Sequence, residues 1–105
     1  MGEFYTKLSG TTFEARDEMI ENLYFAGKLE PGQPLILKRE PYNPYDRNAI
    51  AVLHPETMQQ LGFIRKEVAA TLAPNIDHGF QYRAYVSAVT GGTEYNYGIN
   101  IKIVG

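Results

Sequence analysis

Two segments near the end of the chain alternate apolar and polar residues with a period of two. Apolar side chains occupy every second position of residues 80–88, and again every second position of residues 97–103. This period is typical of a β-strand with one buried face, because successive side chains point to opposite sides of a sheet. Gly91-Gly92 lies between the two segments and favours a turn. The chain therefore has to bury one face of a β-hairpin, which favours a mainly β fold.

Other apolar segments are short and bounded by turn residues such as Pro31-Gly32, which is also typical of strands. A short helix is predicted at residues 66–73, because Val68 and Leu72 share one face and Pro74 then stops the helix. With a second helix described below, this pattern predicts a small, partly closed β-barrel of five or six strands. We expect one domain over residues 1–105. The additional strands are expected at Phe4–Leu8, Leu35–Arg39, Ala49–Leu53 and Leu61–Ile64.

The other helix is expected at about residues 13–25. Thr11 and Glu14 have the spacing of a capping box at its start. Arg16 falls on the apolar side of this helix, an odd place for a guanidinium unless its stem packs and its head emerges at an edge. The apolar side otherwise consists of Phe13, Met19, Ile20 and Leu23.

Several classes of function are disfavoured by what the sequence lacks. With no cysteine there is no disulfide and no thiolate metal site, and His54 and His78 have no neighbours at a metal-ligand spacing. Neither a glycine-rich phosphate loop nor a nucleophile elbow is present, so we expect no cofactor, no metal and no enzymatic activity. No segment is apolar enough for a membrane span or a signal peptide, and we expect a cytoplasmic protein.

One run, residues 39–52, is chemically richer than a connection between two strands requires. It contains Asn43-Pro44-Tyr45-Asp46, whose simplest interpretation is turn chemistry. The alternative is a rigid loop that presents an aromatic ring for base stacking, beside cations that neutralise phosphates. A carboxylate repels phosphate, so Asp46 is expected to accept hydrogen bonds from a sugar hydroxyl or a base amine. The net charge of −2 does not by itself suggest a nucleic-acid partner, but residues 38–66 carry five basic against three acidic residues.

Two further pairs of residues have both an ordinary and a functional interpretation. Arg65-Lys66 opens the predicted second helix, where the two side chains are either solvated charges or a phosphate seat beside the motif loop. Tyr24-Phe25 lies near the end of the first helix, where the rings are either core aromatics or a second stacking wall.

The run at residues 39–52 resembles the hallmark of the HIRAN domain family: an Arg, an acidic residue and Pro, followed by Asn-Pro-Tyr-Asp and then Asn-Ala-Ile. Further matches occur at residues 62–69, 72–74 and 89–92, and the resemblance covers most of residues 5–104. The family has an OB-like barrel, found alone in bacteria and fused to helicase or nuclease modules elsewhere. The resemblance implies capture of the 3′ end of single-stranded DNA at stalled replication forks.

The resemblance also implies roles for individual residues. Tyr45 would stack on a terminal base, Asp46 would bind the 3′-hydroxyl, Asn43 would shape the pocket and Lys66 would contact phosphate. An Arg-Tyr pair completes the pocket in the family; one register places its tyrosine on Tyr24, and another places its arginine on Arg16. Two departures are visible: Phe63 replaces a phosphate-contacting histidine, and Gly91 or Gly92 replaces an aromatic residue.

We therefore expect a non-enzymatic DNA-binding module for single strands, with a free 3′-hydroxyl or at frayed or stalled forks, in DNA repair or replication. Tyr45 and Asp46 lead the expected site, in which Lys66 with Arg16 or Arg65 holds phosphates. The alternative is a protein-interaction module that recruits a DNA-processing partner such as a helicase or nuclease. In neither case is a membrane expected as a partner.

Overall fold

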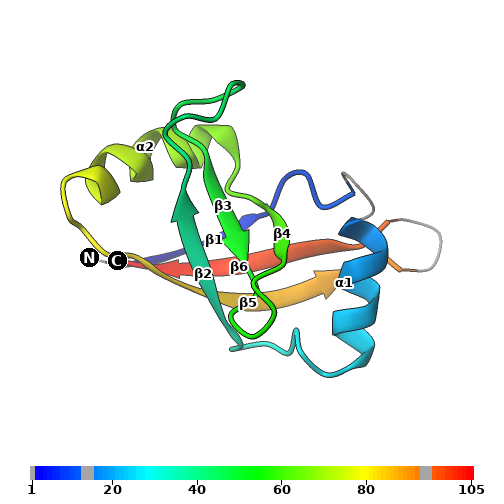
Figure 1. The fold of residues 1–105 in the computed structure, drawn as a ribbon. Helices are drawn as coiled ribbons and strands as arrows, with labels where there is room; N and C mark the ends of the chain where they lie inside the picture. Colours follow the sequence, from blue (N-terminus) through cyan, green and yellow to red (C-terminus); the bar gives the residue numbers. More distant parts are fainter. Residues whose placement is uncertain (1, 13–15, 93–95) are drawn as a thin grey trace.

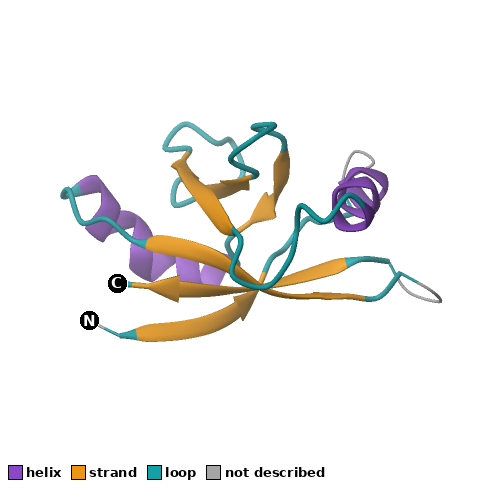
Figure 2. Cartoon of the chain, turned by 90° about the horizontal axis from the view of Figure 1, so that it is seen from below, coloured by secondary structure: helices purple, strands orange, loops and turns teal. Residues whose placement is uncertain are grey.

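A computed structural model describes residues 2–12, 16–92 and 96–105 of the chain. Six strands form one curled, entirely antiparallel sheet in the order β1-β6-β5-β2-β3-β4, with a helix near each end (Figures 1 and 2). The elements in chain order are β1 (Glu3–Lys7), α1 (Arg16–Phe25), β2 (Pro34–Arg39), β3 (Ile50–Leu53), β4 (Gln60–Phe63), α2 (Lys66–Asp77), β5 (Arg83–Thr90) and β6 (Gly98–Val104).

The sheet bends at β2, which changes its neighbour halfway along. Pro34 and Leu35 pair with β5, whereas Ile36 to Arg39 pair with β3. As a result β1, β6 and β5 form one long layer, and β3 and β4 rise away from it (Figure 2). A bulge in β5 between Val86 and Ala88 adds to the curvature.

The curled sheet closes on itself at a single point beyond the end of β1. Ser9 and Phe63 exchange two backbone hydrogen bonds, each with a nitrogen–oxygen distance of 2.9 Å. The neighbouring Gly62 permits this approach, because a Cβ atom there would lie 2.6 Å from the Ser9 carbonyl oxygen. The contact makes a partly closed barrel, as the sequence predicts.

The barrel interior is filled by the residues that the alternating pattern assigns to the buried face. Ile99, Ile101 and Ile103 of β6 are completely buried, and Ala84 and Val86 of the neighbouring β5 lie beside them on the same inward face. The two helices close the ends of this core with small apolar faces. The helical contributors are Ile20 and Leu23 from α1 and Ala69, Leu72 and Ala73 from α2.

The described part of the first helix starts at Arg16, and the expected residues Phe13 and Glu14 lie outside the described residues. The Thr11 hydroxyl, predicted to cap this helix, donates a hydrogen bond to the carbonyl of Tyr97 at 3.1 Å. Thr11 is buried there, so its hydroxyl ties the connection after β1 to the start of β6.

Two predicted boundaries near the second helix are wrong. The helix does not stop at Pro74 but continues to Asp77, because the ring of Pro74 is exposed and later backbone bonds still form, such as that from His78 N–H to the Pro74 carbonyl at 3.1 Å. The following strand begins at Arg83, not Phe80. The amide of Phe80 instead donates to the Asn75 carbonyl, which closes the end of the helix.

Candidate functional site

The loop between β2 and β3, residues 40–49, is organised by the side chain of Asn43. Its Oδ1 atom accepts hydrogen bonds from the amides of Tyr45 at 2.9 Å and Asp46 at 3.2 Å. Its Nδ2 atom donates to the Glu40 carboxylate at 3.0 Å. Asp46 continues the pattern by accepting from the amide of Asn48 at 2.9 Å. The turn chemistry predicted for this run is therefore present, and it fixes the loop from within.

The base of this motif loop is held by Arg39. One guanidinium nitrogen, Nη1, donates to the carbonyls of Arg47 and Ala49, both at 2.9 Å. The other two nitrogens bind the carboxylate of Asp77 in a two-point ion pair, again at 2.9 Å. These bonds raise the pKa of Arg39 and lower the pKa of Asp77. Arg39 thus fastens the loop to the end of α2, a role that the sequence did not indicate.

Turn chemistry alone does not account for the aromatic residues of the loop. The side chains of Tyr42 and Tyr45 are 95% and 92% exposed. A tyrosine held in water by a hydrogen-bonded loop gains almost nothing from burial, so neither ring stabilises the fold appreciably. The loop is a fixed support for rings that remain available to a ligand.

A cavity of about 600 Å³ lies between the motif loop, the segment after β1 and the start of α2. Its volume lies in the range of small-ligand sites. The cavity brings together six of the eight predicted site residues: Asn43, Tyr45, Asp46, Arg16, Phe63 and Lys66. Ser9, Gly10, Pro44, Ala49 and Ile64 complete its lining.

Arg16 reaches this cavity from the apolar side of α1. Its guanidinium donates to the Gly10 carbonyl at 2.9 Å and lies 5.6 Å from the centre of the Phe63 ring, within reach of a cation–π interaction. The unusual placement of an arginine on that face is explained by this position at the barrel's closing point. A cation consequently sits over an aromatic wall inside the cavity.

Lys66 enters the cavity as the first residue of α2. Its side chain is exposed, and the amide groups of the helix start carry partial positive charge near it. Asp46 is half-buried and lines the same cavity. The cavity therefore offers cations together with one carboxylate, a combination suited to a ligand with both an anionic and a hydroxyl group.

Two predicted site residues lie outside the lining of this cavity. Arg65 precedes α2, is exposed and pairs with Glu67 at 2.9 Å. Tyr24 packs against Phe25 and Tyr97 and lines a different cavity of about 420 Å³. Tyr24, one of the two interpretations left open for a second stacking wall, therefore does not line the cavity, whereas Phe63 lines it beneath Arg16.

The buried histidine, His54, makes hydrogen bonds within the fold. His54 is fully buried; its Nδ1 accepts from the Glu56 amide at 3.1 Å, so Nε2 carries the proton and donates to the Lys28 carbonyl at 2.9 Å.

Among the described residues no group of three or more His, Cys, Asp or Glu side chains is arranged to hold a metal ion. Within the same residues no helix is long and apolar enough to cross a membrane.

Sequence reasoning missed Ser9, Ala49 and Ile64 in the cavity lining. None of them carries a chemical signal in the sequence. They line the cavity because the barrel closes between Ser9 and Phe63, a contact between residues 54 positions apart. A pattern confined to neighbouring residues does not contain that information.

Comparison with known proteins gives one consistent result. The HIRAN domain family model matches residues 1–105. The helicase-like transcription factor of Oryctolagus cuniculus is 38% identical over 63 residues, which are 60% of this chain and 6% of that protein. The chain thus spans a small part of the curated relatives that it matches.

Two solved structures share the fold. The crystal structure of the HIRAN domain of human HLTF has a TM-score of 0.68 and 25% identity, covering 97% of this chain and 73% of that chain. The crystal structure of a protein from Lactobacillus plantarum has a TM-score of 0.67 and 21% identity, covering 99% of this chain and 100% of that chain. The similarity to the human domain confirms the expected mainly β, OB-like barrel with two helices.

Proposed function

The chain belongs to the HIRAN domain family, and on that premise we propose that it is a non-enzymatic module that binds single-stranded DNA at a free 3′-hydroxyl end. One observation carries the proposal: Tyr45, Asp46, Arg16 and Lys66, which come from three separate segments, line a single cavity. A stacking ring, a hydroxyl acceptor and two cations are the groups that a terminal nucleotide needs.

Each group has a distinct task. The exposed ring of Tyr45 stacks on the last base, since every base presents an aromatic face. Lys66, at the start of α2, and Arg16, above Phe63, neutralise the phosphates that precede this base. Asn43 takes no direct part but holds the amides of Tyr45 and Asp46 in place.

Asp46 provides the discrimination between ends. One of its oxygens accepts from the Asn48 amide, and the remaining acceptor capacity of the carboxylate is available to a 3′-hydroxyl. A 3′-phosphate would place up to two negative charges beside this carboxylate and be repelled. The proposed module therefore prefers 3′ ends with a free hydroxyl, as occur at frayed duplexes and stalled forks. In this proposal it acts in DNA repair or replication beside a helicase or nuclease.

The test is fluorescence anisotropy with short single strands that end in a 3′-hydroxyl or a 3′-phosphate. Wild type is expected to prefer the hydroxyl. Tyr45→Ala should weaken binding by about 1–3 kcal/mol, the usual worth of one stacked base. Tyr42→Ala is the matched control, because Tyr42 is equally exposed in the same loop but does not line the cavity. Equal losses from both variants would remove Tyr45 from its role.

Asp46→Asn separates end discrimination from loop structure, because the amide oxygen can still accept from Asn48 while the negative charge is gone. This variant should bind both ends with similar affinity. If wild type already binds both ends equally, Asp46 has no part in recognition. A folded protein that binds no single strand even at low salt would instead favour the alternative of a protein-interaction module.

A further inference from the structure

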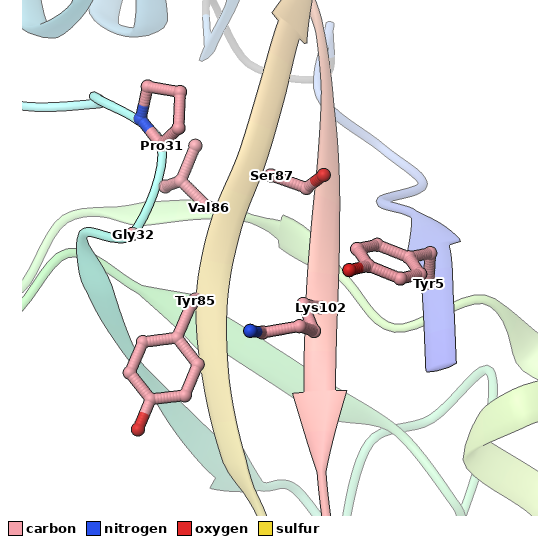
Figure 3. Close-up of a pocket in the computed structure, with 7 residues that line it drawn as sticks. All are labelled: Tyr5, Pro31, Gly32, Tyr85, Val86, Ser87 and Lys102. Carbon is pink, nitrogen blue, oxygen red and sulfur yellow. The ribbon is translucent and has the colours of Figure 1, made fainter. Parts of the chain in front are cut away.

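The outer face of the β1-β6-β5 layer carries a second group of aromatic and basic residues, separate from the motif loop. Tyr5, Lys102 and Tyr85 are direct neighbours across the three strands, in the register Tyr5↔Lys102 and Lys102↔Tyr85. Figure 3 shows the three side chains on one side of the layer, with the Lys102 ammonium extending toward Tyr85. We call these three residues the Tyr-Lys-Tyr row.

The row borders a hollow of about 420 Å³. The turn at Pro31-Gly32 forms its far rim and is held to β5 by the hydrogen bond from the Gly32 amide to the Val86 carbonyl at 2.8 Å (Figure 3). Tyr5, at the other rim, is 62% exposed although it lies within a strand. A ring so exposed on a sheet contributes little to the core and is available for contact.

The charge of this face differs from that of the whole chain. Lys7, Arg83 and Lys102 lie on the face, since they alternate with inward residues on the same strands. Among the described residues of these three strands, Glu3 is the one acidic residue on this side. The Lys102–Glu3 distance of 3.9 Å in an exposed pair makes a weak interaction that a phosphate can replace. The face is thus net positive on a protein of net charge −2.

From these observations we infer that the Tyr-Lys-Tyr row is a second contact surface for single-stranded DNA. Aromatic rings on a sheet surface stack unpaired bases, and a cation between two rings faces the phosphate that links them. Bases inside a duplex are not accessible to rings on a broad sheet, which excludes double-stranded DNA from the row. The inference rests on the proposed function for its choice of polymer.

The position of the row relative to the motif cavity supports one continuous path. β1 carries Tyr5 and leads directly to Ser9 and Gly10, which line the cavity. Ser9 lies four positions after Tyr5, a span of about 13 Å in extended chain. Lys7 lies between them on the same outward side as Tyr5. A strand whose 3′ end lies in the cavity can therefore continue over the edge of β1 onto the row.

The test uses strands that bypass the cavity. Strands of about 12 nucleotides with a 3′-phosphate should still bind the full chain weakly, and strands of about 4 nucleotides should not. The double variant Tyr5→Thr/Tyr85→Thr keeps residues suited to strands and should weaken the 12-nucleotide complex by about 30-fold or more, since each lost ring accounts for about fivefold or more. Tyr42→Ala, which removes an exposed tyrosine outside both the cavity lining and the hollow, should leave that complex unchanged. If the double variant binds the long 3′-phosphate strand as wild type does, the inference is wrong.

A second variant tests the row without removing a ring. On the long strand, Lys102→Gln should make the negative slope of log affinity against log salt concentration shallower by about 0.7. Lys38→Gln, an exposed lysine on β2 outside the hollow, is the matched control and should leave the slope unchanged. An unchanged slope in Lys102→Gln would contradict the inference. The two proposals can fail separately. If the protein shows no preference for a 3′-hydroxyl end but still binds the long 3′-phosphate strand through the row, only the cavity proposal fails. If it prefers the 3′-hydroxyl end but the row variants change nothing, only the row proposal fails.

Discussion

At the scale of single residues, Arg39 shows how the motif loop obtains its rigidity. The loop itself has few apolar contacts, and its two tyrosines are almost fully exposed. Its shape depends instead on hydrogen bonds from Arg39 to the carbonyls of Arg47 and Ala49, while Asp77 fixes the guanidinium from the opposite side. Arg39 thus has four of its five N–H donors engaged in holding the loop and its anchor Asp77.

The Arg39–Asp77 pair predicts a defined pH dependence of stability. Hydrogen bonding and charge from Arg39 hold the pKa of Asp77 below its ordinary value of 3.8. The unfolded chain therefore takes up this proton at a higher pH than the folded chain, so the stabilisation is complete above about pH 4 and is lost as the pH falls below it. Asp77→Asn should lower the free energy of unfolding at pH 7. The gap in unfolding free energy between this variant and wild type should narrow toward pH 3.

Urea denaturation at pH 7, 5 and 3 measures this difference. Glu67→Gln is the control, because it removes another exposed carboxylate of α2 that pairs with Arg65 but holds no loop; exposed pairs of this kind contribute about 0–1 kcal/mol. A difference between wild type and Asp77→Asn that stays constant over the three pH values would show that the ion pair does not stabilise the fold.

At the scale of elements, local patterns predicted the strands well. Alternation in residues 97–103 and the Pro31-Gly32 turn are properties of neighbouring residues, and the observed β6 and β2 follow them within one or two residues. The error at Pro74 has a local cause too, because a proline in an exposed turn of a helix removes one backbone bond without ending the helix. Strand order was not predictable, since β1 pairs with the last strand of the chain.

The candidate site likewise contains residues that are neighbours in the sequence and residues that only the fold brings together. Asn43, Tyr45 and Asp46 are adjacent in sequence, and their chemistry was visible there. Arg16 was visible only as an anomaly, a cation on an apolar helix face, and its partner Phe63 lies 47 positions away. Tyr24 was a plausible aromatic wall, but it lies near the opposite end of α1 from Arg16, packs against Tyr97 and lines another cavity.

The closing contact between the β1 extension and β4 gives a prediction at this scale. A Cβ atom at Gly62 would lie 2.6 Å from the Ser9 carbonyl, a backbone atom that cannot rotate away. Gly62→Ala should therefore separate the two segments, cost about 1–3 kcal/mol of stability and weaken 3′-end binding, because Ser9 and Phe63 line the cavity. Gly2→Ala is the control, since a Cβ atom there meets nothing within 4 Å. Full stability in Gly62→Ala would mean that the barrel does not depend on this closure.

At the scale of the whole molecule, charge is distributed unevenly around a slightly acidic average. The net charge is −2, and α1 carries three acidic residues, Asp17, Glu18 and Glu21. The cations of the candidate cavity, Arg16 and Lys66, come from the starts of two different helices, α1 and α2. Long-range attraction for a polyanion is therefore weak, and the affinity proposed for a short strand has to come from contacts inside the cavity.

This distribution predicts a shallow salt dependence for short strands. Two phosphates neutralised by Arg16 and Lys66 give a slope of log affinity against log salt concentration of about −1.4, since each phosphate contact on a single strand contributes about −0.7. Lys66→Gln should halve the slope, whereas Arg65→Gln should leave it unchanged because Arg65 lies outside the cavity lining. The measurement is fluorescence anisotropy over a range of salt concentrations, with a strand of about 4 nucleotides that ends in a 3′-hydroxyl. A slope steeper than about −3 would require at least four phosphate contacts and would show that cations beyond this cavity hold the short strand.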